Sequence, residues 1–136
     1  MSWSPIGTAC DPCSLHLALV RPLGLVHITG VPCGTREPPV LNSSTKDVAA
    51  GAASYARYCL VCHGMEVVSG GATRDLRRST LLGDQAAWSE MLLGDGGRAV
   101  SMPDFAEHVT PDEAERIRAY VISRAHRLYA DEPHAN

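Results

Sequence analysis

Cys59-Leu60-Val61-Cys62-His63-Gly64 is the stretch of this sequence that decides the fold. Two cysteines three positions apart are followed directly by a histidine, which is the attachment pattern of c-type haem. Thiols at this spacing can each form a thioether to one vinyl group of a single porphyrin, and the histidine then lies where its imidazole can bind the iron. We therefore expect one covalent haem c on Cys59 and Cys62, with His63 as an axial ligand.

The Cys-x-x-Cys spacing also serves redox dithiols and zinc sites, and the sequence leaves both alternatives open. A thioredoxin-like dithiol is expected to follow a β-strand, and no apolar strand precedes Cys59. A zinc site needs a second ligand pair, which Cys10 and Cys13 could supply. The rivals to haem are therefore a zinc module or a dithiol built from these four cysteines.

A helix is expected immediately before the cysteine pair. Residues 46–59 contain no proline, and their alanine, arginine and tyrosine favour a helix, with Thr45 placed to cap its first turn. Gly51, Tyr55 and Cys59 lie four positions apart and share one helix face. The missing side chain of Gly51 predicts the close approach of another helix at that face.

The sixth iron ligand has two main candidates, and Met91 is the first. Its segment reads as a helix that Asp84 caps and Gly94 ends. Trp88, Met91 and Leu92 form an apolar stripe at helical spacing. We expect Met91 to pack in the core.

Met102 is the preferred sixth ligand. It lies in a glycine-rich loop directly before Pro103, far enough along the chain from His63 to reach the opposite face of a haem. Met65 is only two residues past His63 and cannot reach that face. A His–Met pair is typical of low-spin electron carriers. A catalytic haem protein such as a peroxidase needs an open iron site, so Met102 as a ligand argues against that alternative.

The last helix has the clearest signals in the sequence. Thr110, Pro111 and Glu113 form a capping box with proline at the first helical position. The apolar stripe predicts an amphipathic helix that ends near Tyr129. Its members are Ala114, Ile117, Val121, Ala125 and Leu128.

Composition limits the remaining possibilities. The 136 residues have a net charge of −3, which gives no basic footprint for nucleic acid. The best apolar stretch, residues 15–28, is interrupted by Arg21, Pro22 and His27, so we expect no spanning segment there.

Residues 1–45 hold six of the nine prolines and only four charges. We place an irregular extension with a Pro-rich linker at 1–45 and the folded domain at 46–136.

These motifs together resemble a class I cytochrome c domain over residues 46–130. The resemblance rests on Gly51-x3-Tyr55-x3-Cys59-x-x-Cys62-His63, on Met102-Pro103 and on Ile117 and Tyr120 in the final helix. It implies the all-α cytochrome c fold, in which the first and last helices cross at Gly and aromatic positions.

A narrower resemblance is to the C-terminal haem domain of quinohaemoprotein alcohol dehydrogenases. It implies one-electron transfer from a pyrroloquinoline-quinone dehydrogenase module to a quinone or a small soluble redox protein, without enzyme activity of this domain alone. It also implies hydrogen bonds from Arg77, and with them Arg78 and Trp88, to the haem propionates. The stretches that carry it are Leu60–Gly64, Ser69-Gly70-Gly71, Asp75-Leu76-Arg77, Trp88 and Met102-Pro103-Asp104-Phe105.

One position departs from that family pattern. Arg74 replaces a proline whose carbonyl often accepts the hydrogen bond of the haem-ligating histidine, which leaves open the group that orients His63.

Because haem c is attached outside the bacterial cytoplasm, we expect the protein in the periplasm. Methionine ligation in a dry pocket predicts a positive reduction potential.

Overall fold

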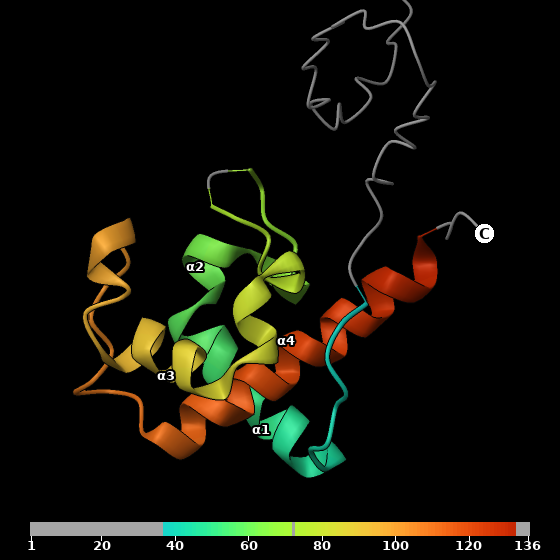
Figure 1. The fold of residues 1–136 in the computed structure, drawn as a ribbon, viewed down its shortest axis with the longest axis horizontal. Helices are drawn as coiled ribbons and strands as arrows, with labels where there is room; N and C mark the ends of the chain where they lie inside the picture. The colour runs from blue at the N-terminus through green and yellow to red at the C-terminus, as the bar shows by residue number, and fades with distance from the viewer. Residues whose placement is uncertain (1–36, 72, 133–136) are drawn as a thin grey trace, which may run out of the picture. The chain divides into compact units, whose positions relative to one another are not determined.

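The computed structural model describes residues 37–71 and 73–132, and this part of the chain contains helices and no strand (Figure 1). The all-α class expected from the sequence is confirmed. Four α-helices are joined by loops that hold short 3₁₀ turns. In chain order the elements are α1 (Thr45–Tyr58), α2 (Leu60–His63), η1 (Met65–Val67), η2 (Leu76–Arg78), η3 (Thr80–Gly83), α3 (Gln85–Leu93), η4 (Arg98–Val100) and α4 (Pro111–Asp131).

Helix α1 begins one residue earlier than the sequence predicts. Ser44, and not Thr45, is the N-cap: its backbone is extended and its hydroxyl accepts a hydrogen bond from the Asp47 amide at 3.1 Å. Both residues are good caps by type, so the local sequence does not separate them. The helix ends at Tyr58, where the Cys59 amide donates to the Tyr55 carbonyl at 2.8 Å.

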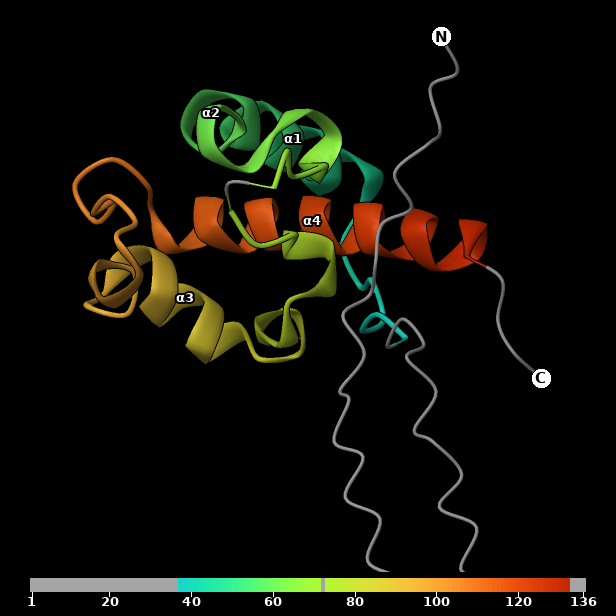
Figure 2. The same ribbon diagram turned by 90° about the horizontal axis from the view of Figure 1, so that it is seen from above.

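Helix α4 is the central element of the described residues, with α1 and α2 on one side and α3 on the other (Figure 2). The capping box is present as predicted: the Glu113 amide donates to the Thr110 hydroxyl, and the Thr110 amide donates to the Glu113 carboxylate. The helix runs to Asp131, two residues past the expected end. Its apolar stripe lies in the core, with Ile117 and Val121 almost fully buried.

The crossing of α1 and α4 is a direct contact between the two backbones. A Cβ atom added to Gly51 would lie 1.8 Å from the carbonyl oxygen of Arg116, so only glycine fits. One turn later the rings of Tyr55 and Tyr120 pack with centroids 5.3 Å apart. The expected helix crossing is therefore present.

Helix α3 also follows its sequence signals. The Asp84 carboxylate accepts from the Ala87 amide at 3.0 Å and caps the helix, and Gly94 ends it. Trp88 and Leu92 are buried, while Met91 is partly buried against the core.

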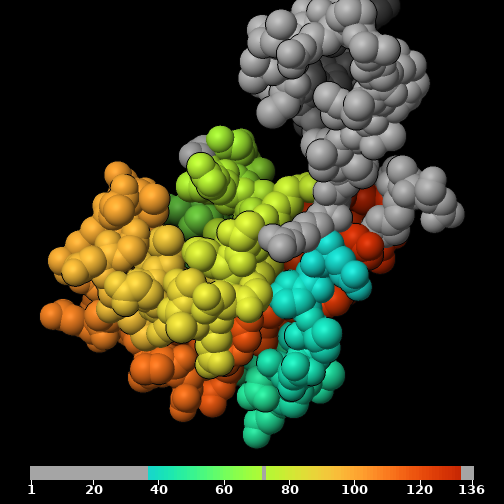
Figure 3. Space-filling view, viewed as in Figure 1, coloured from blue at the N-terminus to red at the C-terminus, as the bar shows by residue number. Residues whose placement is uncertain are grey.

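The residues just before α1 contact the helical domain. His126 on α4 donates from Nε2 to the carbonyl of Pro39, a separation of 2.9 Å, and Leu41 packs against the core. In Figure 3 this cyan segment lies against the orange-red surface of α4. Residues before the predicted domain boundary at residue 45 therefore contact the helices that follow it. Cys10, Cys13 and the apolar stretch 15–28 lie outside the described residues.

None of the helices within 37–71 and 73–132 is both long enough and apolar enough to cross a bilayer.

Replacing Gly51 by alanine should destabilise the protein by about 3 kcal/mol, the upper end of the cost of overpacking, because the new methyl group meets the Arg116 backbone. The free energy of unfolding measured in denaturant tests this. Gly83→Ala is the matched control, since an added Cβ there meets nothing within 4 Å. Equal stabilities of the two variants would contradict the close helix crossing.

Candidate functional site

An apolar cavity lies between the cysteine motif, α3 and the Met102 loop. Its cavity volume is about 80 Å³. Its lining comes from residues widely spread in the sequence: Tyr58, Cys59, Cys62, His63, Leu76, Ser79, Leu81, Trp88, Met91, Leu92, Met102, Pro103, Phe105 and Ile117.

The two thiols lie at one edge of this cavity because α2 follows α1 almost without a break. The His63 amide donates to the Cys59 carbonyl at 2.9 Å, which sets Cys59 and Cys62 one helical turn apart. Burial, aided by the neighbouring Cys62, raises the pKa of the Cys59 thiol to about 11. A redox dithiol instead needs a thiolate of lowered pKa. The site therefore does not favour the dithiol alternative.

His63 also lines the cavity, and its Nδ1 lies 3.4 Å from the hydroxyl oxygen of Thr73. Burial lowers the pKa of His63, and a hydrogen bond to the Arg74 backbone opposes that shift. A backbone group that favours the protonated ring is the carbonyl acting as acceptor. The Arg74 backbone carbonyl is therefore a hydrogen-bond acceptor beside this histidine, a role that does not depend on the side chain of residue 74.

Both methionine candidates reach the cavity wall. The Met102 amide donates to the Gly97 carbonyl at 2.9 Å, which closes the loop. Gly97 is packed closely, since an added Cβ would lie 2.6 Å from the Met91 carbonyl and 3.5 Å from Met102 Cβ. Met91 packs against the core, as expected, and its side chain also borders the cavity.

The indole of Trp88, which the resemblance implies hydrogen-bonds a haem propionate, has a partner inside the protein. The indole has a single donor, and Trp88 Nε1 donates to the carbonyl of Ala114 at 2.9 Å in the buried core. This bond links α3 to the first turn of α4. Trp88 borders the cavity with its ring and has no second N–H to offer a propionate.

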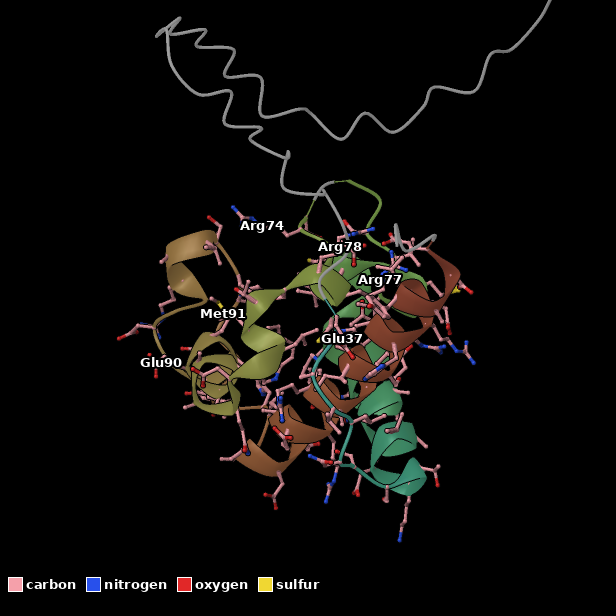
Figure 4. All side chains as sticks on the ribbon, turned by 45° about the vertical axis from the view of Figure 1, so that its right-hand side comes forward. Glu37, Arg74, Arg77, Arg78, Glu90 and Met91 are labelled. Carbon is pink, nitrogen blue, oxygen red and sulfur yellow. The ribbon has the colours of Figure 1, made fainter. Side chains whose placement is uncertain are left out.

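Arg77 is held by Asp75 and does not line the cavity. Its Nε and one terminal nitrogen donate to both carboxylate oxygens of Asp75, at 2.6–3.2 Å. Arg78 pairs with Glu132 at the end of α4. Figure 4 shows Arg74, Arg77 and Arg78 on the same side of the fold.

Several lining residues were not predicted as part of the site. The ring of Phe105 meets that of Tyr58 edge-on at 6.2 Å, and the Tyr58 hydroxyl donates to the His108 carbonyl at 3.1 Å. Phe105 is the only phenylalanine in the chain and lies three residues after Met102. Its place in the sequence close to Met102 is the signal that could have indicated Phe105 as a site residue.

A metal-binding cluster of three or more His, Cys, Asp or Glu side chains does not occur within 37–71 and 73–132. The second pair that a zinc site needs, Cys10 and Cys13, lies outside these residues. The described residues therefore offer zinc no complete ligand set.

Comparison with known proteins identifies the family. Residues 46–121 match the family model described as cytochrome c oxidase, cbb3-type, subunit III. The chain belongs to this cytochrome c family. The match begins within α1 and ends within α4, so it includes every element that lines the cavity.

Two curated relatives show the range of proteins that contain a similar domain. This cytochrome c domain is 42% identical over 100 residues to quinohemoprotein alcohol dehydrogenase ADH-IIG of Pseudomonas putida, covering 71% of this chain and 13% of that protein. It is 34% identical over 79 residues to cytochrome c550 of Pseudomonas aeruginosa, covering 56% of this chain and 54% of that protein.

The solved structure of quinohemoprotein alcohol dehydrogenase ADHIIG from Pseudomonas putida HK5 matches with a TM-score of 0.65 and 39% identity. That match covers 71% of this chain and 14% of the dehydrogenase. The cytochrome c domain therefore spans only a small part of the dehydrogenase that it resembles.

Replacing Trp88 by phenylalanine should lower the free energy of unfolding by about 0.5–1.5 kcal/mol, the net worth of one hydrogen bond, because the Ala114 carbonyl loses the indole donor. Chemical denaturation measures this. Tyr58→Phe is the control, since it also removes one hydrogen bond to a backbone carbonyl, but at an exposed site, and should cost less. A Trp88→Phe protein as stable as the parent would contradict the structural role of this bond.

Proposed function

We propose that this cytochrome c domain holds one covalent haem c and transfers single electrons. The observation that carries the proposal is that Cys59, Cys62, His63 and Met102 all line one apolar cavity. Two thiols, an imidazole and a thioether are the donor set of a His–Met haem c, so these residues fit that group. Haem supplies a reversible Fe(II)/Fe(III) couple when bound.

Each of these residues has a separate role in the proposal. Cys59 and Cys62 form the two thioethers and fix the porphyrin in the cavity. His63 would bind the iron while the Arg74 backbone carbonyl hydrogen-bonds its ring. Met102 would supply a second iron ligand from its loop.

The remaining wall of the cavity sets the electrostatics of the site. Leu76, Leu81, Leu92 and Ile117 exclude water from it. A medium of low polarity disfavours the extra positive charge of Fe(III), and a methionine ligand also favours Fe(II). We therefore expect a positive reduction potential.

The electron donor and acceptor are proposed from the similarity of this domain to known proteins. The relative at 42% identity is named as a quinohemoprotein alcohol dehydrogenase, so the donor that we propose is a dehydrogenase module with pyrroloquinoline quinone. The acceptor is a quinone or a small redox protein. The domain itself carries electrons and does not oxidise the alcohol. Since haem c is attached outside the bacterial cytoplasm, we propose a periplasmic location.

Replacing Met102 by alanine should convert the iron from low-spin to high-spin or water-bound and lower the reduction potential, because the sixth ligand is lost. Absorption spectroscopy and a redox titration measure both effects. Both effects come from the loss of an iron ligand and not from unfolding. They should therefore appear even if the Met102→Ala protein remains folded.

Met91→Ala is the matched control on the same cavity wall. It should cost stability near the lower end of the roughly 2–5 kcal/mol range for buried methionines, since Met91 is only partly buried, and leave the spectrum low-spin. The reverse pattern, with the ligand lost in Met91→Ala and kept in Met102→Ala, would place the sixth ligand on α3 and contradict the proposal.

A further inference from the structure

Thr73 connects the cysteine motif to the loop that follows it. Its hydroxyl donates to the carbonyl oxygen of Cys62 at 2.9 Å, across eleven positions of sequence. Its own carbonyl accepts a hydrogen bond from the Ser69 hydroxyl at 2.5 Å. The first bond holds the Thr73 side chain, and the second holds its backbone.

The same hydroxyl lies beside the ligand histidine. Thr73 Oγ1 is 3.4 Å from Nδ1 of His63. Because its proton is committed to Cys62, the oxygen presents lone pairs to that nitrogen and can act only as an acceptor there. Nδ1 carries the proton when the iron binds the other ring nitrogen, so it is a donor.

The Arg74 backbone is a second hydrogen-bond partner of the His63 ring. Thr73 and Arg74 are consecutive residues, and both lie beside this imidazole. A distance of 3.4 Å is long for a sole hydrogen bond and is suited to the weaker branch of a shared one, with the carbonyl as the main partner.

We propose that Thr73 is a positioning residue for the axial histidine: its hydroxyl joins the Cys62 backbone to the Nδ1 edge of His63 and shares the Nδ1 proton with the Arg74 carbonyl. The inference rests on the proposed function, because it requires His63 to bind iron. Acceptors at Nδ1 fix the orientation of the ring and make the ligating nitrogen more basic. A more basic ligand stabilises Fe(III), so Thr73 lowers the reduction potential.

The test uses the holoprotein and three variants at this loop. Thr73→Val keeps the branched shape and removes the hydroxyl. Thr73→Ser keeps the hydroxyl and removes the methyl group. Ser69→Ala removes the loop bond to the Thr73 carbonyl and leaves the hydroxyl beside His63.

A redox titration and the nuclear magnetic resonance signal of the His63 Nδ1 proton are the two measurements. At a fixed ambient potential near the midpoint, Thr73→Val should shift the ratio of oxidised to reduced protein toward the reduced form by roughly twofold, the lower end of the effect of a neutral hydrogen bond, since this contact is the weaker branch. Its Nδ1 proton should move upfield. Thr73→Ser should restore both values, and Ser69→Ala should leave both close to the parent.

The outcomes separate this inference from the proposed function. A parent protein without covalent haem would overturn both. A parent with low-spin haem, together with a Thr73→Val variant of unchanged potential and unchanged Nδ1 signal, would overturn the role of Thr73 alone. If Thr73→Val fails to retain haem while Thr73→Ser retains it, the hydroxyl is a condition of attachment and the tuning role is wrong.

Discussion

The close approach of α1 and α4 at Gly51 determines where the cysteine motif lies. Since the Arg116 carbonyl occupies the space of a side chain at Gly51, the two helices meet at one register. That register places Tyr55 against Tyr120, and the Tyr55 hydroxyl donates to the carbonyl of Gly64 at 2.8 Å. The residue after His63 is thereby tied to the helix crossing, so the position of His63 depends on packing some twelve residues earlier in the chain.

A second tie holds the turn that follows the motif. Glu66 and Val67 both have positive φ, 57° and 64°, a conformation that costs a β-branched residue on the order of 1–3 kcal/mol. The turn persists because Val67 is fully buried and Arg124 pairs with Glu66 at 2.5 Å while stacking over the ring of Tyr120. The turn at Glu66 and Val67 and the hydrogen bond from Tyr55 to Gly64 therefore both depend on the packed pair Tyr55 and Tyr120. Together they fix the loop that follows His63.

Local signals in the sequence predicted the elements well. The Thr110 capping box, the Asp84 cap and the Gly51–Tyr55 face depend on residues a few positions apart, and their chemistry does not need the rest of the fold. The cap of α1 was one residue off because Ser44 and Thr45 are equally suitable. Each of these elements could be placed before any long-range contact was known.

The contacts that orient the site depend on tertiary structure and could not be predicted. The only indole donor of Trp88 is used by Ala114, which lies 26 positions away. The acceptor for His63 is a backbone carbonyl, a group that every residue has, so the sequence at Arg74 does not indicate it. Thr73 was missed for a similar reason, because a single threonine in a loop has no distinctive spacing to the motif.

The central claim is that this fold closes around a haem bound through Cys59 and Cys62. The most direct test is the intact mass of the denatured protein after production in bacteria that have a haem-attachment system, followed by mapping of the modified peptide. The account predicts the mass of one haem retained after denaturation and located on the peptide with residues 59–63. An unmodified mass, or zinc bound in place of haem, would contradict it.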